Sequence, residues 1–309
     1  MPSKEILRTI VAGVALLGLL PQASAQTPEI RLAEQFSIGY LQLNVIKHQQ
    51  LIEKHAKALG IPNAKVSWFK FNGPTAVNEA LISGNIDIGS QPFLLNTSNP
   101  AIKSIADFKD SDRIAVPAVK SSVQAFTLQM AAAKAFGAKE FEKLDALTVA
   151  MTPPDATIAL LKGGAQISAA FSVPPFQYMQ LEDPKIHTVL NSFDVMGGSH
   201  TFTAIWTPAK FRDGNPVLYK AFIAALKEAT EIVNKDKRAA AALWIEDSKS
   251  KLPLDTAAKI VSGAQVHWTM TPENTMKFAD FMASVGRLKT KPGSWKDYFF
   301  PEIYDVNGS

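Results

Sequence analysis

Cysteine is absent from the 309 residues of this chain, and so are the common catalytic signatures. Without cysteine there is no disulfide, no thiol nucleophile and no acceptor for a lipoprotein anchor. The motifs G-x-S-x-G, H-E-x-x-H and G-x-G-x-x-G do not occur, and Gly84-x-x-x-x-Gly89 lacks the Lys-Ser/Thr that completes a phosphate-binding loop. Four acids near expected strand ends are more typical of helix caps and turns than of a catalytic pair: Glu34, Asp87, Asp155 and Asp194. The sequence therefore argues against an enzyme, and we expect no cofactor.

A strong charge of one sign is missing as well. The chain has 32 Lys and Arg against 28 Asp and Glu, which gives a formal net charge of only +4. No basic stripe is interleaved with stacking aromatic residues, so we expect no nucleic-acid partner. His48 and His55 share a predicted helix but have no acid or cysteine at ligand spacing, which favours surface positions over a metal site.

The N-terminal residues have the pattern of an export signal. A basic start with Lys4 and Arg8 precedes an apolar run at 10–20, which is too short for a stable membrane span, and an A-x-A cleavage pattern occupies 23–25. We expect cleavage near Ala25 and a soluble exported protein. Removing 25 of the 309 residues leaves 284, a size at which chains divide into two lobes.

The stretch 68–90 has the pattern of a strand, a helix and a second strand. Strand-forming residues come first, Pro74 suits a first helical position, and Gly84 suits the left-handed residue that ends a helix. Such a βαβ unit requires a parallel sheet, whose ligands collect at the carboxyl ends of the strands and beside helix N-termini. The first place where we expect a ligand is therefore the loop 72–75.

Strands and helices alternate twice along the chain, which predicts an α/β fold with two lobes. After the second β/α run the sequence is largely helical, and we expect these C-terminal helices to pack on the first lobe. The expected first lobe is 26–98 with 205–309, the second lobe is 99–204, and the chain crosses between them near 94–99 and 202–207.

Several expected helices begin directly at a strand end with a capping residue. These starts are at Gly73-Pro74-Thr75, at Ser121-Ser122, where either serine suits the cap, and at Thr152-Pro153. Each start presents free backbone N–H groups and the positive end of the helix dipole, which suit a small anion. Every α/β protein has such starts, so a purely structural role is the alternative for each. Asp155 would repel an anion from the third.

The connection after Gly89 is unusually short. Gln91-Pro92 leads directly into the strand-like segment 93–95, whereas a parallel crossover needs about a dozen residues. Two explanations are open. Either the strands before and after the connection are not parallel neighbours, or a unit is missing between them.

The segments FNGPTAVNEALISGNIDIG (71–89), SIADFKDSDRIAVP (104–117) and SVPPF (172–176) resemble those of a known family. The family is the periplasmic substrate-binding proteins of nitrate, sulfonate, taurine and bicarbonate ABC importers, to which the thiamine-pyrimidine precursor binders are similar. The resemblance implies a type II periplasmic binding protein fold with two Rossmann-like lobes and a hinge that close on one ligand. In the family a helix and a strand follow the D-I-G motif, so the resemblance implies an internal deletion after Gly89.

The resemblance also implies which loops line the ligand. They contain the following residues: Phe36, Tyr40, Asn72, Gly73, Thr75, Ser90, Ser121, Ser122, Gln124, Phe171 and Pro174. We expect hydrogen bonds from Thr75, Ser121 and Ser122. The aromatic residues stand at or beside strand ends, where such residues either wall a ligand or belong to the core.

The predicted function is that of an extracytoplasmic solute receptor. It would be a monomer that binds a small oxyanion or sulfonate-like organic acid and delivers it to an ABC permease at the inner membrane. The related ligands are sulfonate, nitrate and bicarbonate, and no metal is expected. Two alternatives are a non-transport binding protein, such as a sensor partner or a receptor that has lost its ligand, and a pyrimidine-synthase-like enzyme on the same scaffold.

Overall fold

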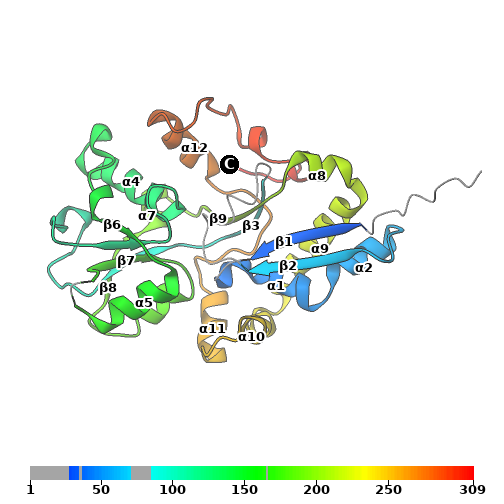
Figure 1. Ribbon diagram of the computed structural model, residues 1–309, viewed down its shortest axis with the longest axis horizontal. Coiled ribbons are helices and arrows are strands. Elements are labelled where there is room, and N and C mark those ends of the chain that lie inside the picture. Colours follow the sequence, from blue (N-terminus) through cyan, green and yellow to red (C-terminus); the bar gives the residue numbers. More distant parts are fainter. Residues whose placement is uncertain (1–27, 35–36, 71–84, 165) are drawn as a thin grey trace, which may run out of the picture.

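The computed structural model describes residues 28–34, 37–70, 85–164 and 166–309 (Figure 1). The expected export signal and the first predicted ligand loop, 72–75, lie outside these residues. In Figure 1 a sheet with its helices forms one lobe, and a helix-rich lobe with two strands lies beside it. The α/β class predicted from the alternating pattern is confirmed. In the described part of the chain, no helix combines the length and apolar character that a membrane span requires.

The first lobe is built on a parallel pair of strands. In this pair β1 (Glu29–Glu34) lies beside β2 (Lys65–Lys70). The helices of this lobe are α1 (Leu41–His48), α2 (Leu51–Ala58), α9 (Pro216–Lys235), α10 (Lys237–Ser248) and α11 (Leu254–Val261). Their apolar faces meet in one core, in which Ile46, Ile52 and Leu226 are fully buried. The prediction that C-terminal helices pack on the first lobe is confirmed for α9, α10 and α11.

The single helix that was expected to hold both His48 and His55 is divided by the structure into α1 and α2. The break is at Gln50, whose backbone is left-handed with φ 50°. Glycine usually occupies such positions, and its absence here leaves no local signal for the break. The division lets both short helices contact α9.

The second lobe is a five-stranded sheet in the order β6-β5-β7-β4-β8. Its strands are β4 (Leu94–Thr97), β5 (Ile114–Val116), β6 (Thr148–Ala150), β7 (Ala169–Ser172) and β8 (His187–Asn191). Strands β5, β6 and β7 are parallel, while β4 runs antiparallel to β7 and β8. Alternate residues of β5 and β7 face two separate apolar clusters, one with Ile114 and Phe171 and the other with Ala115 and Ala170. The covering helices are α4 (Val123–Phe136), α5 (Pro153–Lys162), α6 (Phe176–Gln180) and α7 (Ser192–Met196).

The strands β3 (Asn85–Ser90) and β9 (Thr201–Trp206) form a separate antiparallel pair. In Figure 1 they run between the two lobes, so we refer to this pair as the hinge strands. Beyond β9 the chain enters α8 (Ala209–Gly214) and then α9. The crossing expected near 202–207 therefore coincides with a hinge strand, whereas the other hinge strand precedes the expected segment 94–99.

Two expectations about the segment around Gly89 need correction. First, β3 pairs antiparallel with β9, so the described strands do not form the expected parallel βαβ unit. Second, β4 lies inside the five-stranded sheet and not at a crossing. Because β3 and β4 belong to different sheets, the three residues between them are sufficient and no parallel crossover is required. The first of the two explanations for the short connection is thus correct, and the internal deletion stays a prediction.

The C-terminal segment also contacts the second lobe. Helix α12 (Thr275–Ser284) and the turns after it follow the first-lobe helices in the chain. Asn274 Nδ2 donates to the Ser199 carbonyl at 2.6 Å, and Arg287 donates to the Lys120 carbonyl at 2.7 Å. The C-terminal residue Ser309 is fixed to the start of α12 through its carbonyl, which accepts from the Thr275 amide. The segment from α12 to the C-terminus is therefore a second bridge between the lobes, beside the hinge strands.

Candidate functional site

The two lobes touch where loops follow the parallel strands β1 and β7. Ser37 Oγ donates to the Pro174 carbonyl at 2.9 Å, and the Ile38 amide donates to the same oxygen at 3.3 Å. Ser37 also caps a short 3₁₀ turn by accepting from the Gly39 amide at 2.9 Å. The strand ends that were expected to face a ligand from both lobes are therefore adjacent in space.

The hinge strand β9 packs against the same first-lobe loop. A Cβ atom built on Gly39 would lie 2.4 Å from the Phe202 ring, so only glycine allows this close approach. Phe202 in turn lies beside Phe93, with ring centroids 5.9 Å apart. The ring centroids of Phe93 and Phe171 are 5.5 Å apart. A continuous row of contacts thus runs from the first lobe through the hinge into the core of the second lobe.

Most of the predicted ligand residues that the structure describes make hydrogen bonds or pack inside the fold. Ser90 is fully buried, and its hydroxyl donates to the His200 carbonyl at 2.6 Å. Phe171 is 1% exposed and lies in the core. Ser122 is the cap of α4, where its hydroxyl accepts from the Ala125 amide and donates to the Ala118 carbonyl. These hydrogen bonds already use the hydroxyl groups of Ser90 and Ser122.

The remaining predicted residues differ in their surroundings. Ser121 is exposed, Gln124 is buried, and Tyr40 packs at the edge of the first-lobe core. Desolvation raises the pKa of the Tyr40 hydroxyl to about 12, so the group is neutral and able to donate. Pro174 contributes the carbonyl that joins the lobes. Four predicted residues lie outside the described part of the chain: Phe36, Asn72, Gly73 and Thr75. The ligand-binding role of the whole set stays a prediction.

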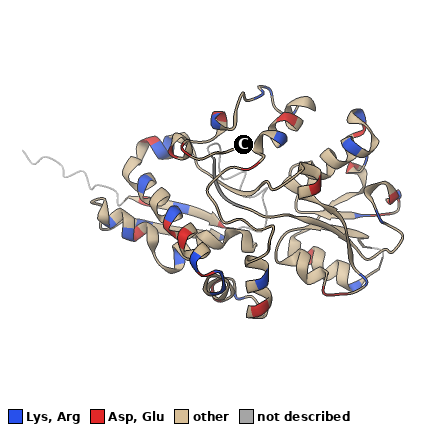
Figure 2. Cartoon of the chain, turned by 180° about the vertical axis from the view of Figure 1, so that it is seen from behind, with Lys and Arg blue, Asp and Glu red and all other residues tan. Residues whose placement is uncertain are grey.

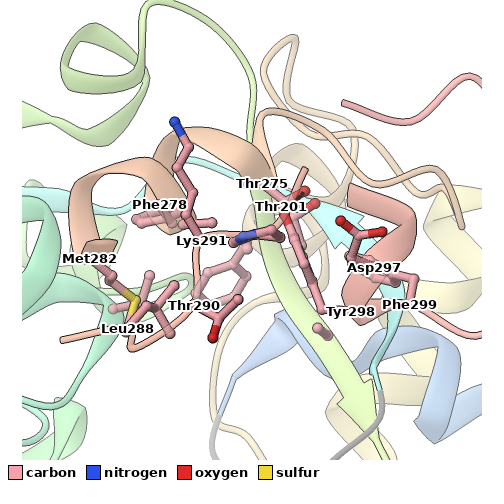
Figure 3. Close-up of a pocket in the computed structure, with 15 residues that line it drawn as sticks. Thr201, Thr275, Phe278, Met282, Leu288, Thr290, Lys291, Asp297, Tyr298 and Phe299 are labelled. Atoms are coloured by element: carbon pink, nitrogen blue, oxygen red, sulfur yellow. Dashed lines mark hydrogen bonds between the residues drawn. The ribbon is translucent and has the colours of Figure 1, made fainter. Parts of the chain in front are cut away.

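A cavity of about 760 Å³ lies between α4, β9 and the C-terminal segment (Figure 3). Phe278 and Met282 of α12 line it together with Leu288. Several of its polar groups are already paired: Tyr298 donates to Thr275 Oγ1 at 2.8 Å, Lys291 lies 2.9 Å from Asp280, and Asp297 accepts from the Gly293 and Ser294 amides. This cavity therefore offers mainly apolar surface.

A second cavity, of about 400 Å³, lies between the lobes and differs in its chemistry. We call it the acidic pocket. From the first lobe it is lined by Glu34 at the end of β1, Asn44 of α1 and Asp247 of α10, and from the second lobe by residues of and before α6. Among the described residues, the expected ligand loops reach this pocket through neighbours of the predicted residues, such as Ser37 and Pro175, and not through the predicted residues themselves.

A partly buried network of charges lies at the wall of the acidic pocket. Lys47 Nζ lies 3.1 Å from Glu34 Oε1 and 2.9 Å from Asp247 Oδ1, and Asn44 Nδ2 donates to Asp247 Oδ2 at 2.7 Å. Burial lowers the pKa of Lys47, but the hydrogen bonds to Asp247 and Glu34 outweigh it, so the pKa is raised and the lysine is cationic. From the sequence, Glu34 was expected only as a strand-end acid, and Lys47 and Asp247 were not predicted. No sequence signal joins two residues 200 positions apart.

Elsewhere on the molecule the charges are dispersed. Figure 2 shows basic and acidic residues intermixed over the helices, without a face of one sign. Among the described residues, no group of three or more His, Asp or Glu side chains is placed to hold a metal ion. His48 is exposed, and His55 lies 2.7 Å from Glu228 in a partly exposed pair.

A buried histidine, His200, directly precedes the hinge strand β9. His200 Nδ1 lies 2.8 Å from the Thr201 carbonyl, so this nitrogen carries the proton. The other nitrogen then accepts from the Ser192 hydroxyl at 2.8 Å, while that hydroxyl accepts from the Phe93 amide. The imidazole edges meet the rings of three phenylalanines: Phe93, Phe193 and Phe278. The network therefore holds His200 in its neutral form.

We expect this histidine to make the hinge region sensitive to acid. Burial lowers the pKa of His200 from 6.5 to about 4, against weaker opposing effects of the Thr201 carbonyl and Glu273. Between these two pH values the unfolded chain binds a proton that the folded chain does not, so stability should fall by up to about 3 kcal/mol as the pH drops from 7 to 4. His200→Gln should remove this part of the pH dependence. Urea unfolding at pH 7.5 and 4.5 tests it, and equal losses in both proteins would contradict it.

Neither a family model nor a curated protein matches the sequence. Solved structures do match. The periplasmic aliphatic sulphonate-binding protein SsuA of Escherichia coli is 19% identical over 86% of this chain and 95% of that chain, with a TM-score of 0.62. The alkanesulfonate-binding protein SsuA of Xanthomonas axonopodis pv. citri, bound to MOPS, is 17% identical over 87% and 96%, with a TM-score of 0.64. The periplasmic nitrate-binding protein NrtA of Synechocystis PCC 6803 is 13% identical over 86% and 83%, with a TM-score of 0.66.

These likenesses extend over most of both chains. The chain therefore has the fold of periplasmic substrate-binding proteins, as the resemblance in sequence predicted. At this level of identity the likeness defines the fold alone.

Proposed function

We propose that the chain is an extracytoplasmic solute receptor. It binds a small oxyanion or sulfonate-like organic acid between its two lobes and delivers the ligand to an ABC importer permease. The observation that carries the proposal is the meeting of strand-end loops from two lobes across a pair of hinge strands, with the Pro174 carbonyl bound by Ser37 and Ile38. Opening and closing of such lobes is a population shift that a ligand drives by its preference for the closed form.

The start of one second-lobe helix supports an anionic ligand group. Helix α4 is 14 residues long, begins beside the loop after β5 and is capped by Ser122. No acidic residue occupies its first turn, whereas α5 has Asp155 there. The dipole of α4 is thus available for a negative group near its N-terminus, as in other helix-end anion sites.

A ligand panel tests the proposal. Thermal melting of the purified protein would be recorded with sodium nitrate, sodium bicarbonate, propane-1-sulfonate and a pyrimidine, with sodium chloride at equal ionic strength as the control. A ligand at one hundred times its dissociation constant adds about 2.7 kcal/mol to the free energy of unfolding, which raises the melting temperature measurably. We expect at least one acid to do so. If no member of the panel exceeds the chloride control at millimolar concentration, the proposed ligand class is wrong.

A further inference from the structure

Helix α12 lies between the cores of the two lobes. Before the helix, Trp268 belongs to the first-lobe core, and after it the chain returns to that core with Trp295 and Phe299. Within α12, Met276 packs against the first-lobe core, whereas Phe278 packs against the core of the second lobe. The chain therefore leaves the first lobe at α12, contacts the second lobe there and then returns.

Polar and aromatic contacts hold α12 to the second lobe near both of its ends. In its first turn, Lys277 Nζ donates to the Met196 carbonyl at the end of α7. Near its last turn, the ring of Phe281 meets that of Phe141 edge to face, with centroids 6.1 Å apart. The helix is thus attached to the second lobe along its length, although it belongs to a chain segment that is anchored in the first.

Arg287, just beyond the end of α12, makes three further contacts with the second lobe. Its Nη1 donates to the Lys120 carbonyl at 2.7 Å, its Nη2 lies 3.5 Å from Glu142 Oε1, and its guanidinium lies over the ring of Phe126 in α4, 5.3 Å from the ring centroid. The Lys120 ammonium does not compete for Glu142, because it lies 3.8 Å from Asp145. A guanidinium presents its donors in a rigid plane, so this one side chain fixes the C-terminal segment to α4 and to the loop before it.

The surroundings of α12 leave it room to move. The cavity of about 760 Å³ lies between α12, the hinge strand β9 and the start of α4, and Phe278 and Met282 of α12 line it (Figure 3). Protein interiors are otherwise closely packed, so a helix beside such a space can shift without displacing a filled core. Residues 288–294, which lead from Arg287 back to the first lobe, form neither a helix nor a strand.

We propose that α12 and Arg287 form a clamp that holds the two lobes together and limits their opening. This inference rests on the proposed function, in which the lobes open and close around a ligand. One end of the clamp is fixed in the first-lobe core at Trp295, and the other is fixed to the second lobe at the Lys120 carbonyl and Phe126. When the lobes separate, either the contacts of Arg287 break or residues 288–294 must extend. The contacts therefore favour the closed form, which is also the form that a ligand selects.

The distance between the lobes tests the clamp in the protein without ligand. Spin labels on cysteines that replace Lys57 of α2 and Lys162 of α5 report this distance by double electron–electron resonance, because the chain has no other cysteine. Arg287→Met keeps an unbranched side chain of similar reach but removes the donors. A charge-assisted hydrogen bond is strong enough that its loss should lower the ratio of closed to open form by about tenfold, which appears as a component at longer distances.

Lys289→Met is the matched control, because Lys289 is an exposed cation of the same segment and does not line the cavity. We expect it to leave the distance distribution unchanged. The clamp is overturned if Arg287→Met has the distribution of the unaltered protein, or if Lys289→Met lengthens the distance as much. Arg287→Lys keeps the charge and a donor and should restore part of the short distance. A lysine variant no shorter than the methionine variant would also overturn the role of this hydrogen bond.

A second variant and a ligand complete the test. Phe281→Ala removes the aromatic contact of the clamp and should lengthen the distance too, so it decides the question if circular dichroism shows that Arg287→Met is not folded. Saturating propane-1-sulfonate is then added to each protein. If it returns the open component of Arg287→Met to the short distance, both the clamp and the proposed function are supported. If it changes none of the proteins, the proposed ligand class is contradicted, while the comparison without ligand still decides for or against the clamp.

Discussion

Replacing Phe93 by alanine is expected to lower the free energy of unfolding by about 3–5 kcal/mol. Phe93 is fully buried at the point where the chain passes from the hinge strand β3 into the second lobe. Its ring contacts those of Phe171, His200 and Phe202, so the substitution opens a cavity beneath the hinge as well as removing apolar surface. This loss is a large fraction of the stability of a typical protein, about 5–15 kcal/mol.

Urea denaturation monitored by tryptophan fluorescence measures this effect. The control is Phe69→Ala on β2. Phe69 is 48% exposed, so this substitution should lower the free energy of unfolding by about 1 kcal/mol or less. Equal losses in the two variants would show that Phe93 does not join the hinge to the second-lobe core.

A second large effect is expected from Lys47→Met. This change keeps the length of the side chain but leaves Glu34 and Asp247 facing each other without a cation. Removing one member of a buried charge network costs about 3–5 kcal/mol, and the value should lie near the lower bound because the Lys47 side chain is 30% exposed. Without the cation, the two carboxylates repel each other when both are ionised. The deficit relative to the unaltered protein should therefore grow as the pH rises from 4 to 7.

Lys54→Met is the matched control for this prediction. Lys54 also pairs with a carboxylate, that of Glu228, but its side chain is 58% exposed. Surface pairs of this kind contribute about 0–1 kcal/mol. Chemical denaturation of the three proteins at pH 4 and pH 7 separates the two cases. A Lys47→Met deficit that is small, or that does not change with pH, would contradict the role of Lys47 as the shared cation.

Structural features that depend on interactions between neighbouring residues were predicted correctly from the sequence. The start of α5 was predicted at Thr152-Pro153. Thr152 is the observed cap, and its Oγ1 accepts from the Asp155 amide. The cap of α4 was narrowed to two serines, of which the structure selects Ser122. Such caps are contained within four residues, so their signals are complete in the sequence.

Structural features that depend on a partner far along the chain were not predicted. The strand β3 was given a parallel neighbour because it follows a strand and a helix pattern, yet its partner is β9, more than one hundred residues later. The acidic pocket depends in the same way on Lys47 meeting Asp247. The loops that approach the pocket were predictable from strand ends. The side chains that give the pocket its charge were not, because their partners are set by tertiary packing.

We expect the two lobes to close on a small organic acid. The chain has no cysteine, so the pair Lys57→Cys and Lys162→Cys places two spin labels at unique exposed positions, on α2 of the first lobe and α5 of the second. Double electron–electron resonance then measures the distance between the lobes. Saturating propane-1-sulfonate or its 3-amino analogue is predicted to narrow the distance distribution and shift it to shorter values. A distribution that neither compound changes would contradict the claim.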